Sequence, residues 1–410
     1  RAVNVSTERA GEAPPSPDDL EKTLSEYGIA GRVKYDGTGR MTHIFLLKSD
    51  RDPRISRMNG LHTDIARDIG FPNIRFARKA RGRIQIEVER KTRQTLSLAD
   101  FREALCAEWM SSVSYRTACD VHGDEAPIDI GKSPNLLVAG QDQNGLQDVL
   151  RGMIASLMAG AYHAPTETTV ISLRSAQLPL LDDGAPAQNH AETGIDRLIR
   201  DRKEAIAALE DAAEEIDSRH ETLGKYGIRN IEGYNGQLSR QGANDSMSLE
   251  VIQTGFDDQG HPVWLRRAMP RSPMTRKAIV IDGLEDLMKT HPRRLDAIFS
   301  RMGQRGLSCG IHVLAGMTRK PSNMDEAVMR SFFTTRVCLR DTRKQDATWL
   351  LGGRDTSVLA EKLDGLLLTR DGKLKRLHFA CVPAPHLGRL KPVLDWANTT
   401  RQDDPDTSLH

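Results

Sequence analysis

A glycine-containing loop between an apolar segment and an amphipathic segment is the strongest candidate for chemistry in this sequence. The apolar segment ends at Ala139, glycines follow at Gly140 and Gly145, and apolar residues then recur at helical spacing over Leu146–Met158. A buried strand that leads through such a loop into a helix presents helix N–H groups that can bind phosphate. The pattern therefore predicts a phosphate-binding loop over residues 140–147.

This loop lacks the side chains that phosphoryl transfer requires. In the pattern G-x-x-x-x-G-K-[ST] the lysine neutralises the β- and γ-phosphates, and the hydroxyl ligates Mg²⁺. Leu146 and Gln147 occupy these two positions, and Asp142 adds a negative charge inside the loop. Leucine cannot offset the charge of a triphosphate, and a glutamine amide is a poorer Mg²⁺ ligand than a hydroxyl. Leu146 can equally be the first residue on the apolar face of an ordinary helix.

Asp282 is the second candidate for chemistry. It ends the apolar segment Ala278–Ile281 and is followed by Gly283. Asp282 can also act simply as the N-cap of a following helix.

The elements that hold these residues are predicted by alternating apolar and amphipathic segments. From residue 111 onward, short apolar segments alternate with longer amphipathic ones, which predicts a mostly parallel α/β sheet. The expected strands are Asn135–Ala139, Thr169–Leu173, Lys277–Ile281, Ile311–Ala315, Thr335–Leu339 and Gly365–Thr369. Helices are expected over Leu146–Met158 and over the long, acidic segment Ile195–Leu223, with a surface loop at Ser175–Thr193.

The N-terminal quarter has a different pattern and predicts a small α+β domain over residues 18–110. Its expected elements are a helix at Leu20–Tyr27, strands at Gly31–Tyr35 and Met41–Leu47, a helix at Ile55–Ile69 and a strand at Arg83–Glu89. A larger domain is expected over residues 111–398. Residues 1–17 are expected to form a disordered tail, and residues 399–410 a flexible one.

Composition excludes several protein classes. The 410-residue chain has 58 lysine and arginine residues against 56 acidic residues and a formal charge of +2, so any polyanion site has to be local. The five cysteines include no C-x-x-C pair, which argues against a zinc site or a disulfide framework and favours a reducing compartment. No apolar run approaches the roughly 20 residues that span a bilayer. The chain begins at Arg1 without an initiator methionine, which is compatible with a fragment whose membrane segment lies upstream.

Several separate segments together resemble the motor region of the FtsK/SpoIIIE family of double-stranded DNA translocases. The segments, in family order, are Leu20–Thr95, Pro134–Gly140 with Gly145, Gly227–Asn235, Ala278–Met288, and Gly310–His312 with Pro321–Ser322. The third reads G-I-R-N-I-E-G-Y-N against the family's G-V-R-N-L-x-G-Y-N, and the first resembles the small domain before the motor. The resemblance spans about Asp18 to Trp396. It implies a RecA-like P-loop NTPase-type sheet that follows a small α+β domain.

The same resemblance implies that the nucleotide site is degenerate. Leu146 and Gln147 replace the lysine and serine of the loop, and Ala315–Pro321 lacks the glutamine of the family's A-T-Q-R-P segment. In the family an aspartate at the position of Asp282 supports Mg²⁺, and the glutamate after it activates the attacking water. Gly283 replaces that glutamate here, and Glu285 is the nearest alternative. We therefore expect a pseudo-ATPase with no intact catalytic residue, no metal site and no cofactor, in which ATP with Mg²⁺ binds only if another residue rescues the loop. The vestigial phosphate loop comprises Gly140, Asp142, Gly145, Leu146 and Gln147.

A basic segment offers a different kind of function. It contains Arg75, Arg78, Lys79, Arg81, Arg83, Arg90, Lys91 and Arg93, opposed only by Glu87 and Glu89. A local patch of this kind is sufficient to contact the phosphates of duplex DNA. It can equally be a solvated surface or an ion-pairing face between subunits. Arg229, inside the family-like segment, can meet a neighbouring subunit's phosphate or simply close a loop.

Three functional hypotheses follow from the resemblance. The favoured one is a catalytically degenerate FtsK/SpoIIIE-like subunit that binds double-stranded DNA or a partner in a DNA transfer or translocation assembly, such as a conjugation machine. Its expected partner is an active FtsK-like paralogue in a mixed oligomer, in the cytoplasm or at the inner face of the membrane. The alternative is an active ATP-driven DNA translocase with a non-standard loop. The third is a scaffold of a protein-secretion ATPase complex.

Overall fold

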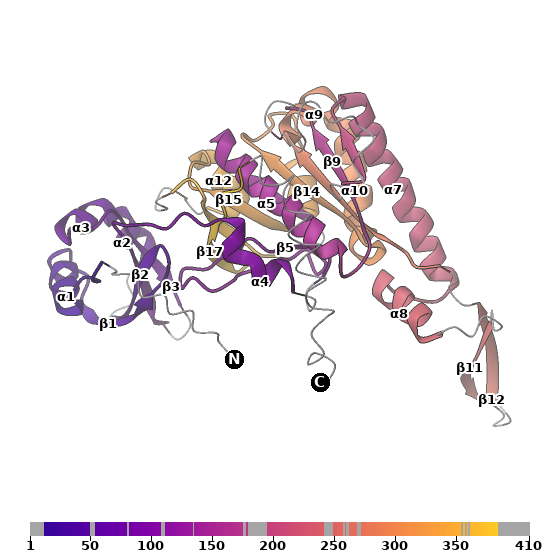
Figure 1. The fold of residues 1–410 in the computed structure, drawn as a ribbon, viewed down its shortest axis with the longest axis horizontal. Coiled ribbons are helices and arrows are strands. Elements are labelled where there is room, and N and C mark those ends of the chain that lie inside the picture. Colours follow the sequence, from indigo (N-terminus) through magenta and orange to yellow (C-terminus); the bar gives the residue numbers. More distant parts are fainter. Residues whose placement is uncertain are drawn as a thin grey trace.

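The fold was described from a computed structural model of the chain. It describes residues 12–49, 54–79, 82–107, 111–133, 135–174, 178, 195–241, 249–256, 259, 262–268, 272–353, 356, 359 and 361–383. A small antiparallel domain lies beside a larger α/β domain along the long axis of the molecule (Figure 1). None of the described helices is both long enough and apolar enough to cross a membrane.

The small domain packs three short helices against a four-stranded sheet. Its elements are α1 (Pro17–Glu26), β1 (Gly31–Thr38), β2 (Thr42–Ser49), α2 (Ile55–Gly60), α3 (His62–Asp68), β3 (Ile74–Arg78) and β4 (Ile84–Glu89). The strand order is β1-β2-β4-β3 with every pair antiparallel, so β1 and β3 are the two edges. The single helix expected over Ile55–Ile69 is two helices separated at Leu61, and β3 was not anticipated.

The large domain is built on a nine-stranded sheet within the described residues. Its order is β10-β9-β13-β14-β8-β15-β16-β17-β6. The strands are β6 (Ala118–Cys119), β8 (Asn135–Ala139), β9 (Thr166–Ser172), β10 (Arg197–Ile199), β13 (Arg276–Asp282), β14 (Ile311–Met317), β15 (Thr335–Leu339), β16 (Asp364–Leu368) and β17 (Leu374–Phe379). The pairs from β10 to β15 are parallel, and those from β15 to β6 are antiparallel.

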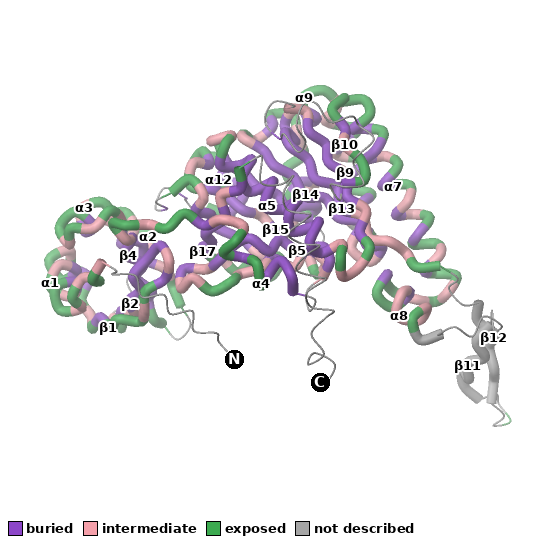
Figure 2. Tube along the Cα trace, in the orientation of Figure 1, coloured by how far each residue is buried: buried purple, intermediate pink, exposed green. Residues whose placement is uncertain are grey.

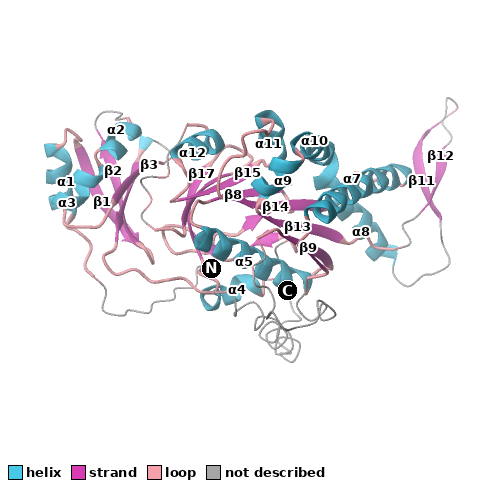
Figure 3. Cartoon of the chain, turned by 90° about the horizontal axis from the view of Figure 1, so that it is seen from above, coloured by secondary structure: helices cyan, strands magenta, loops and turns pink. Residues whose placement is uncertain are grey.

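Helices cover both faces of this sheet, and Figure 3 shows them on opposite sides. The helix α5 (Gln143–Ala161) packs on one face, in a core that takes alternate residues of the central strands. The other face is covered by α7 (Arg202–Lys225), α9 (Leu284–Thr290), α10 (Pro292–Cys309), α11 (Glu326–Phe332) and α12 (Lys344–Leu351). The central strands are therefore buried on both sides (Figure 2), which explains why they read as continuous apolar runs.

Smaller elements complete the described chain. The 3-10 helix η2 (Leu98–Phe101) and α4 (Arg102–Leu105) precede the large sheet, and β5 (Ser114–Tyr115) pairs with β7 (Ile128–Asp129). After α7 come α8 (Ile231–Gln241) and the antiparallel hairpin of β11 (Leu249–Phe256) and β12 (Pro262–Ala268), which extends away from the sheet in Figure 1.

The fold class expected from the sequence is confirmed. The six expected strands of the large sheet are all present, with ends that differ by at most a few residues. The expected helix over Ile195–Leu223 is wrong at its start, because Arg197–Ile199 forms β10 and the helix begins only after its N-cap Asp201. Residues 1–11, 399–410 and all of Ser175–Thr193 except Leu178 lie outside the described residues, and Pro17 already begins α1.

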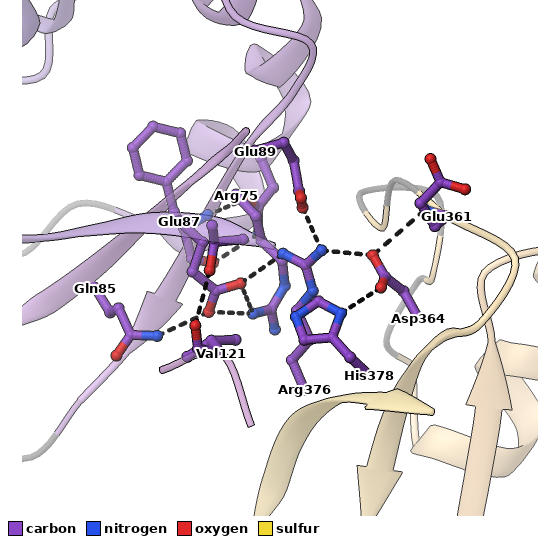
Figure 4. A network of polar contacts seen from close by, with 12 residues as sticks. Arg75, Gln85, Glu87, Glu89, Val121, Glu361, Asp364, Arg376 and His378 are labelled. Atoms are coloured by element: carbon purple, nitrogen blue, oxygen red, sulfur yellow. Dashed lines mark hydrogen bonds and ion pairs between the residues drawn. The ribbon is translucent and has the colours of Figure 1, made fainter. Parts of the chain in front are cut away.

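A buried ion network joins the two domains (Figure 4). Arg376 on β17 contacts Glu87 and Glu89 on β4 and Asp364 on β16, and its Nη1 lies 2.9 Å from Glu87 Oε2. On the side of the small domain, Arg75 Nη1 lies 2.8 Å from Glu87 Oε1. Burial alone would raise the pKa of Glu87, but the charges of Arg75 and Arg376 prevail and lower it to about 2. The buried carboxylates of the network therefore need the neighbouring arginine charges to remain ionised.

Candidate functional site

The candidate site lies at the carboxyl edge of the parallel strands. Gly140 follows β8, Asp282 ends β13, and Asp341 follows β15. The strand register brings them together, because Met317 at the end of β14 pairs with Ala139 of β8. Ligands of open α/β sheets bind at this edge, where the chain leaves each strand. The residues singled out in the loop and at Asp282 thus share one site.

The helix N-terminus in the loop is capped by a carboxylate from the loop itself. Asp142 is the N-cap of α5, and its side chain accepts hydrogen bonds from the backbone N–H groups of Asn144 (3.2 Å) and Gly145 (3.4 Å). The N–H of Gly140 donates to the carbonyl of Met317 at 3.1 Å. These are the groups that a phosphate would need. The Asp142 carboxylate takes the position that an anion would otherwise occupy.

A second carboxylate closes the loop from β15. Asp341 accepts a hydrogen bond from the backbone N–H of Asp142. Burial, and then the nearby charge of Asp142, raise the pKa of the Asp341 carboxyl above its ordinary value. Lys362 Nζ lies 3.6 Å from Asp142 Oδ2, where it partly offsets the two acids. The loop therefore presents negative charge where a triphosphate would need positive charge.

Leu146 belongs to the apolar core. It is fully buried and lies in the same core cluster as Leu150 on α5. A Cβ built on Gly316 of β14 would lie 3.4 Å from Leu146 Cδ1 and 2.9 Å from Leu150 Cδ1. The residue after Gly145 therefore packs against the strand instead of reaching toward the loop. These surroundings match the alternative interpretation of Leu146, as the first residue on the apolar face of an ordinary helix.

Gln147 is bonded to Asp282. Both side chains are buried, and Gln147 Nε2 donates a hydrogen bond to Asp282 Oδ2 at 3.0 Å. Burial raises the pKa of Asp282 to about 6, although the Gln147 hydrogen bond and the charge of Arg174 act in the opposite direction. Asp282 is not a helix N-cap, because the N-cap of α9 is Gly283.

Gly283 and Glu285 are the two residues after Asp282 at which a second carboxylate was considered. Gly283 has φ of 84° and ψ of 47°, a left-handed conformation that favours glycine over any side chain. Glu285 is buried and accepts a hydrogen bond from the backbone N–H of Thr318 at 2.9 Å. Arg174 Nη2 lies 2.6 Å from Glu285 Oε1. Glu285 is therefore held by structural partners through its Oε1, while its Oε2 has no partner among the described residues.

The residues present do not fit Mg²⁺ and a nucleotide triphosphate. No lysine follows Gly145, the N–H groups of Asn144 and Gly145 already have an acceptor, and Leu146 is packed in the core. Among the described residues, no group of three or more His, Cys, Asp or Glu side chains could hold a metal ion. The buried oxygens Gln147 Oε1 and Asp282 Oδ1 are the only polar atoms of this pair without a described donor.

The structure separates the basic candidates. Arg75 is buried in its ion pair with Glu87, whereas Arg78, Lys79 and Arg83 are exposed on the β3 and β4 side of the small sheet. Arg81 lies outside the described residues. Lys91, after β4, is exposed as well, so four of the described basic side chains are open to contact with a polyanion.

Arg229 is exposed and lies far from the loop along the sheet. It precedes α8, whose Asn235 exchanges hydrogen bonds with the backbone of Met274, just before β13 begins. Asp282 ends that same strand at the opposite edge. Arg229 therefore does not share a site with the loop of this chain.

Sequence reasoning missed three residues that shape the site. Asp341 had a usable signal, because it lies two residues after an expected strand and parallel strand ends meet at one edge. Arg174 follows β9 at the same edge and had the same signal. Lys362 had none, because it lies before an antiparallel strand and approaches the loop only through the fold.

Comparisons with known proteins agree with this architecture. The sequence model of the FtsK/SpoIIIE family matches residues 105–322. The DNA translocase FtsK of Caulobacter vibrioides is 28% identical over 363 residues, a match that covers 88% of this chain and 43% of that protein. A second DNA translocase FtsK, from Bradyrhizobium diazoefficiens, is also 28% identical, over 88% of this chain and 43% of its own length. The chain thus spans less than half the length of these relatives.

Solved structures support the fold. The pCW3 conjugation coupling protein TcpA, in its monomer form with ATPγS, superposes with a TM-score of 0.57 at 15% identity, over 92% of this chain and 99% of that one. EssC (ATPases 2 and 3) from Geobacillus thermodenitrificans gives a TM-score of 0.50 at 12% identity, over 72% and 51% of the two chains. At these identities the likeness concerns the fold alone. The sequence match, over more than half of the chain, carries the assignment: this chain belongs to the FtsK/SpoIIIE family.

Proposed function

We propose that this chain is a catalytically degenerate member of its family, a DNA- or partner-binding subunit of a DNA transfer or translocation assembly that does not hydrolyse ATP by itself. The observation that carries the proposal is the capping of α5 by Asp142, which engages the N–H groups of Asn144 and Gly145. A phosphate would have to displace this carboxylate and would meet Asp341 beside it.

The rest of the site supports the same conclusion. Phosphoryl transfer depends almost entirely on positioning and on positive charge around the transferred group. Here the residue after Gly145 is an apolar core residue, and the position after Asp282 has a left-handed backbone. Glu285, the remaining acid nearby, is held by Thr318 and Arg174. Asp282 and Glu285 are thus each tied to a protein group through one oxygen, and no second carboxylate stands directly beside Asp282.

A role on DNA rests on charge and on the names of the relatives. The curated relatives are DNA translocases, and the superposed TcpA is a conjugation coupling protein. Arg78, Lys79 and Arg83 are exposed on one side of the small sheet, which suits contact with phosphates. A chain with a closed loop still offers such a surface, and a paralogue with an intact loop would supply the hydrolysis in a mixed assembly.

The test is an ATP hydrolysis and duplex-binding assay on the chain alone and with a co-purified partner. We expect no DNA-stimulated hydrolysis by the chain alone and no Mg²⁺-ATP binding by calorimetry. Asp142→Ala removes the capping carboxylate, so this variant is expected to gain weak binding of inorganic pyrophosphate. Asp371→Ala, which removes an exposed acid on the turn before β17, is the matched control. Hydrolysis by the unmodified chain that disappears in Asp282→Asn would overturn the proposal.

An active translocase with a non-standard loop is the second candidate. It is favoured by one observation, the buried Asp282 at the carboxyl end of β13, which accepts a hydrogen bond from Gln147 of α5. In that case an experimental structure at millimolar ATP would contain Mg²⁺-nucleotide at Gly140–Gln147, with the Asp142 carboxylate displaced from Gly145. A loop still closed by Asp142 under those conditions removes this candidate.

A further inference from the structure

A cavity of about 430 Å³ lies where the small domain meets the large sheet. Its walls come from β3 and β4 on one side and from β16, β17 and the segment 120–127 on the other. Its lining includes Arg75, Lys79, Gln85, Glu87 and Lys375. The volume falls within the range of roughly 300–1,000 Å³ that is usual for small-molecule sites.

The acids of this cavity are already engaged by the protein. Both oxygens of Glu87 have partners, since Oε1 lies 2.8 Å from Arg75 Nη1 and Oε2 lies 2.9 Å from Arg376 Nη1. Asp120 Oδ1 accepts the backbone N–H of His122 at 2.8 Å. These carboxylates therefore interact with arginines or with backbone N–H groups of the protein itself.

Glu125, the third acid, is held in the same way. Its Oε1 accepts the backbone N–H of Ala104 at 3.2 Å. By contrast, Lys79 and Lys375 are exposed and make no ion pair with any carboxylate of the described residues. Lys79 lines the cavity from the small domain, and Lys375 lines it from the large domain. The cavity consequently offers net positive charge to a bound molecule.

The floor of the cavity contains buried polar atoms with unused capacity. Gln85 is 2% exposed, and its Nε2 donates to Glu87 while its Oε1 has no donor among the described residues. Arg75 Nε likewise has no acceptor there. Figure 4 shows Gln85 and Arg75 on either side of the Glu87 carboxylate. A buried acceptor and a buried donor beside an open cavity suit a ligand that carries hydrogen-bonding groups of its own.

The remaining wall is apolar and is formed by Val121, Pro127, Leu367, Leu374 and Leu377. We propose that this cavity binds a small organic phosphate monoester, with the phosphate between Lys79 and Lys375 and the organic part against the apolar wall. Lysine ammonium groups act as point charges for phosphate, and the aliphatic wall excludes water from the organic part. A ligand held by both domains would stiffen their junction, which the Arg376 network already joins.

Titration calorimetry with four probes tests this site: AMP, ribose 5-phosphate, adenosine and inorganic phosphate. AMP is expected to bind, ribose 5-phosphate more weakly, and adenosine and inorganic phosphate at least tenfold more weakly than AMP. Bound AMP is also expected to raise the melting temperature of the chain, because it binds only the folded state. Equal binding of AMP and adenosine would show that the lysines do not select phosphate, and would overturn the proposal.

Four variants locate the binding. Lys79→Ala and Lys375→Ala are each expected to weaken AMP binding by about tenfold, the loss typical of one charged hydrogen bond. Lys373→Ala is the matched control, an exposed lysine two residues away that pairs with Asp371 at the turn. Lys362→Ala removes the lysine beside the closed loop and is expected to leave AMP binding unchanged. All of these changes are at exposed or partly exposed side chains, so folding is preserved and is checked by thermal melting.

Two further results would refute the proposal. The first is the absence of AMP binding by the unmodified chain at millimolar concentration. The second is binding that survives in Lys79→Ala and Lys375→Ala but weakens in Lys362→Ala, which would place the ligand at the loop. Binding of duplex DNA through Lys79 and Lys375 without any binding of AMP is a case of the first result. It would mean that these lysines bind a nucleic acid and not a small phosphate monoester.

Discussion

Gln147, the fifth residue of α5, and Asp282 at the end of β13 are joined by a buried hydrogen bond of 3.0 Å between Nε2 and Oδ2. The bond connects the helix that follows the loop to the strand that carries the acid, across the central part of the sheet. Each residue thereby satisfies a polar group of the other that burial would otherwise leave unpaired. The pair stabilises a closed arrangement at the carboxyl edge, and the first prediction concerns its charge.

Replacement of Asp282 by asparagine is expected to stabilise the chain at alkaline pH. Burial raises the pKa of Asp282 from 3.8 to about 6, so the folded state binds this proton more tightly than the unfolded state. The stabilisation of the folded state by this proton is complete below about pH 4 and is lost as the pH rises through about 6. Asp282→Asn is therefore expected to gain roughly 1–3 kcal/mol in the free energy of unfolding at pH 8 and nothing at pH 4. Denaturant titrations at both pH values measure it.

Asp286→Asn is the matched control, with the opposite sign. Burial would raise the pKa of Asp286, but its contacts with Lys289 and Arg174 prevail and lower it below the ordinary value. Its stabilisation is therefore present above the unfolded pKa and is lost in acid. The control variant should lose stability at pH 8. If both variants shift in the same direction, the assignment of the raised pKa to Asp282 is wrong.

Restoration of the acid beside Asp282 is expected to fail. Gly283→Glu places a side chain at φ of 84°. Its Cβ would also lie 3.2 Å from Asp286 Oδ2. A left-handed conformation costs a non-glycine residue about 1–2 kcal/mol, so the variant should be less stable and should still not hydrolyse ATP. Gly224→Glu, on an exposed turn of α7 with an open Cβ direction, is the control and should be neutral or stabilising. Equal stability of the two variants would contradict the strain argument.

Removal of Arg376 is expected to destabilise the junction of the domains strongly. Arg376→Leu leaves Glu87, Glu89 and Asp364 buried around a missing charge, and loss of one partner of a buried ion pair costs about 3–5 kcal/mol. The pKa of Glu87 is lowered to about 2, so its stabilisation is present above about pH 4.5 and is lost as the pH falls toward 2.

The effect of Arg376→Leu should consequently shrink in acid, where the stranded carboxyls become protonated. Thermal unfolding at pH 7 and at pH 4 measures the difference. Arg370→Leu, an exposed arginine at the turn before β17, is the control and should change stability by less than about 0.5 kcal/mol. A loss at pH 4 as large as the loss at pH 7 would indicate that packing, and not the ion network, is responsible.

Duplex binding is expected to depend on one side of the small sheet. The triple change of Arg78, Lys79 and Arg83 to alanine should flatten the log–log slope of affinity against salt by about 0.9 for each DNA phosphate that the variant no longer neutralises. The same charge is removed by alanine at Arg32, Lys34 and Lys48, exposed on β1 and β2 toward the other edge, and this control should leave the slope nearly unchanged. Fluorescence anisotropy at several salt concentrations measures both. Equal effects of the two triples would mean that only net charge matters.

The sequence by itself determined six of the nine described strands of the large sheet and the identity of the loop residues, but not β6, β10 or β17. Asn135–Ala139 and Thr335–Leu339 were predicted to the residue, because strands that are buried on both faces are mostly apolar. The start of α7 was predicted wrongly because the apolar residues Ile195 and Ile199 fit a buried helix face and a buried strand equally well. The strand β10 forms only through its pairing with β9.

The tertiary structure decided what the loop residues do. Replacement of the lysine by Leu146 can be read from the sequence, but that Asp142 caps α5 and that Asp341 closes over it depends on where β15 ends. In the sequence, Arg75 cannot be distinguished from its basic neighbours. In the structure it is buried, because β4 places Glu87 beside it and β17 places Arg376 against the same carboxylate. Sequence patterns report local periodicity and composition, whereas a charge's partner is set by chain segments that meet only after folding.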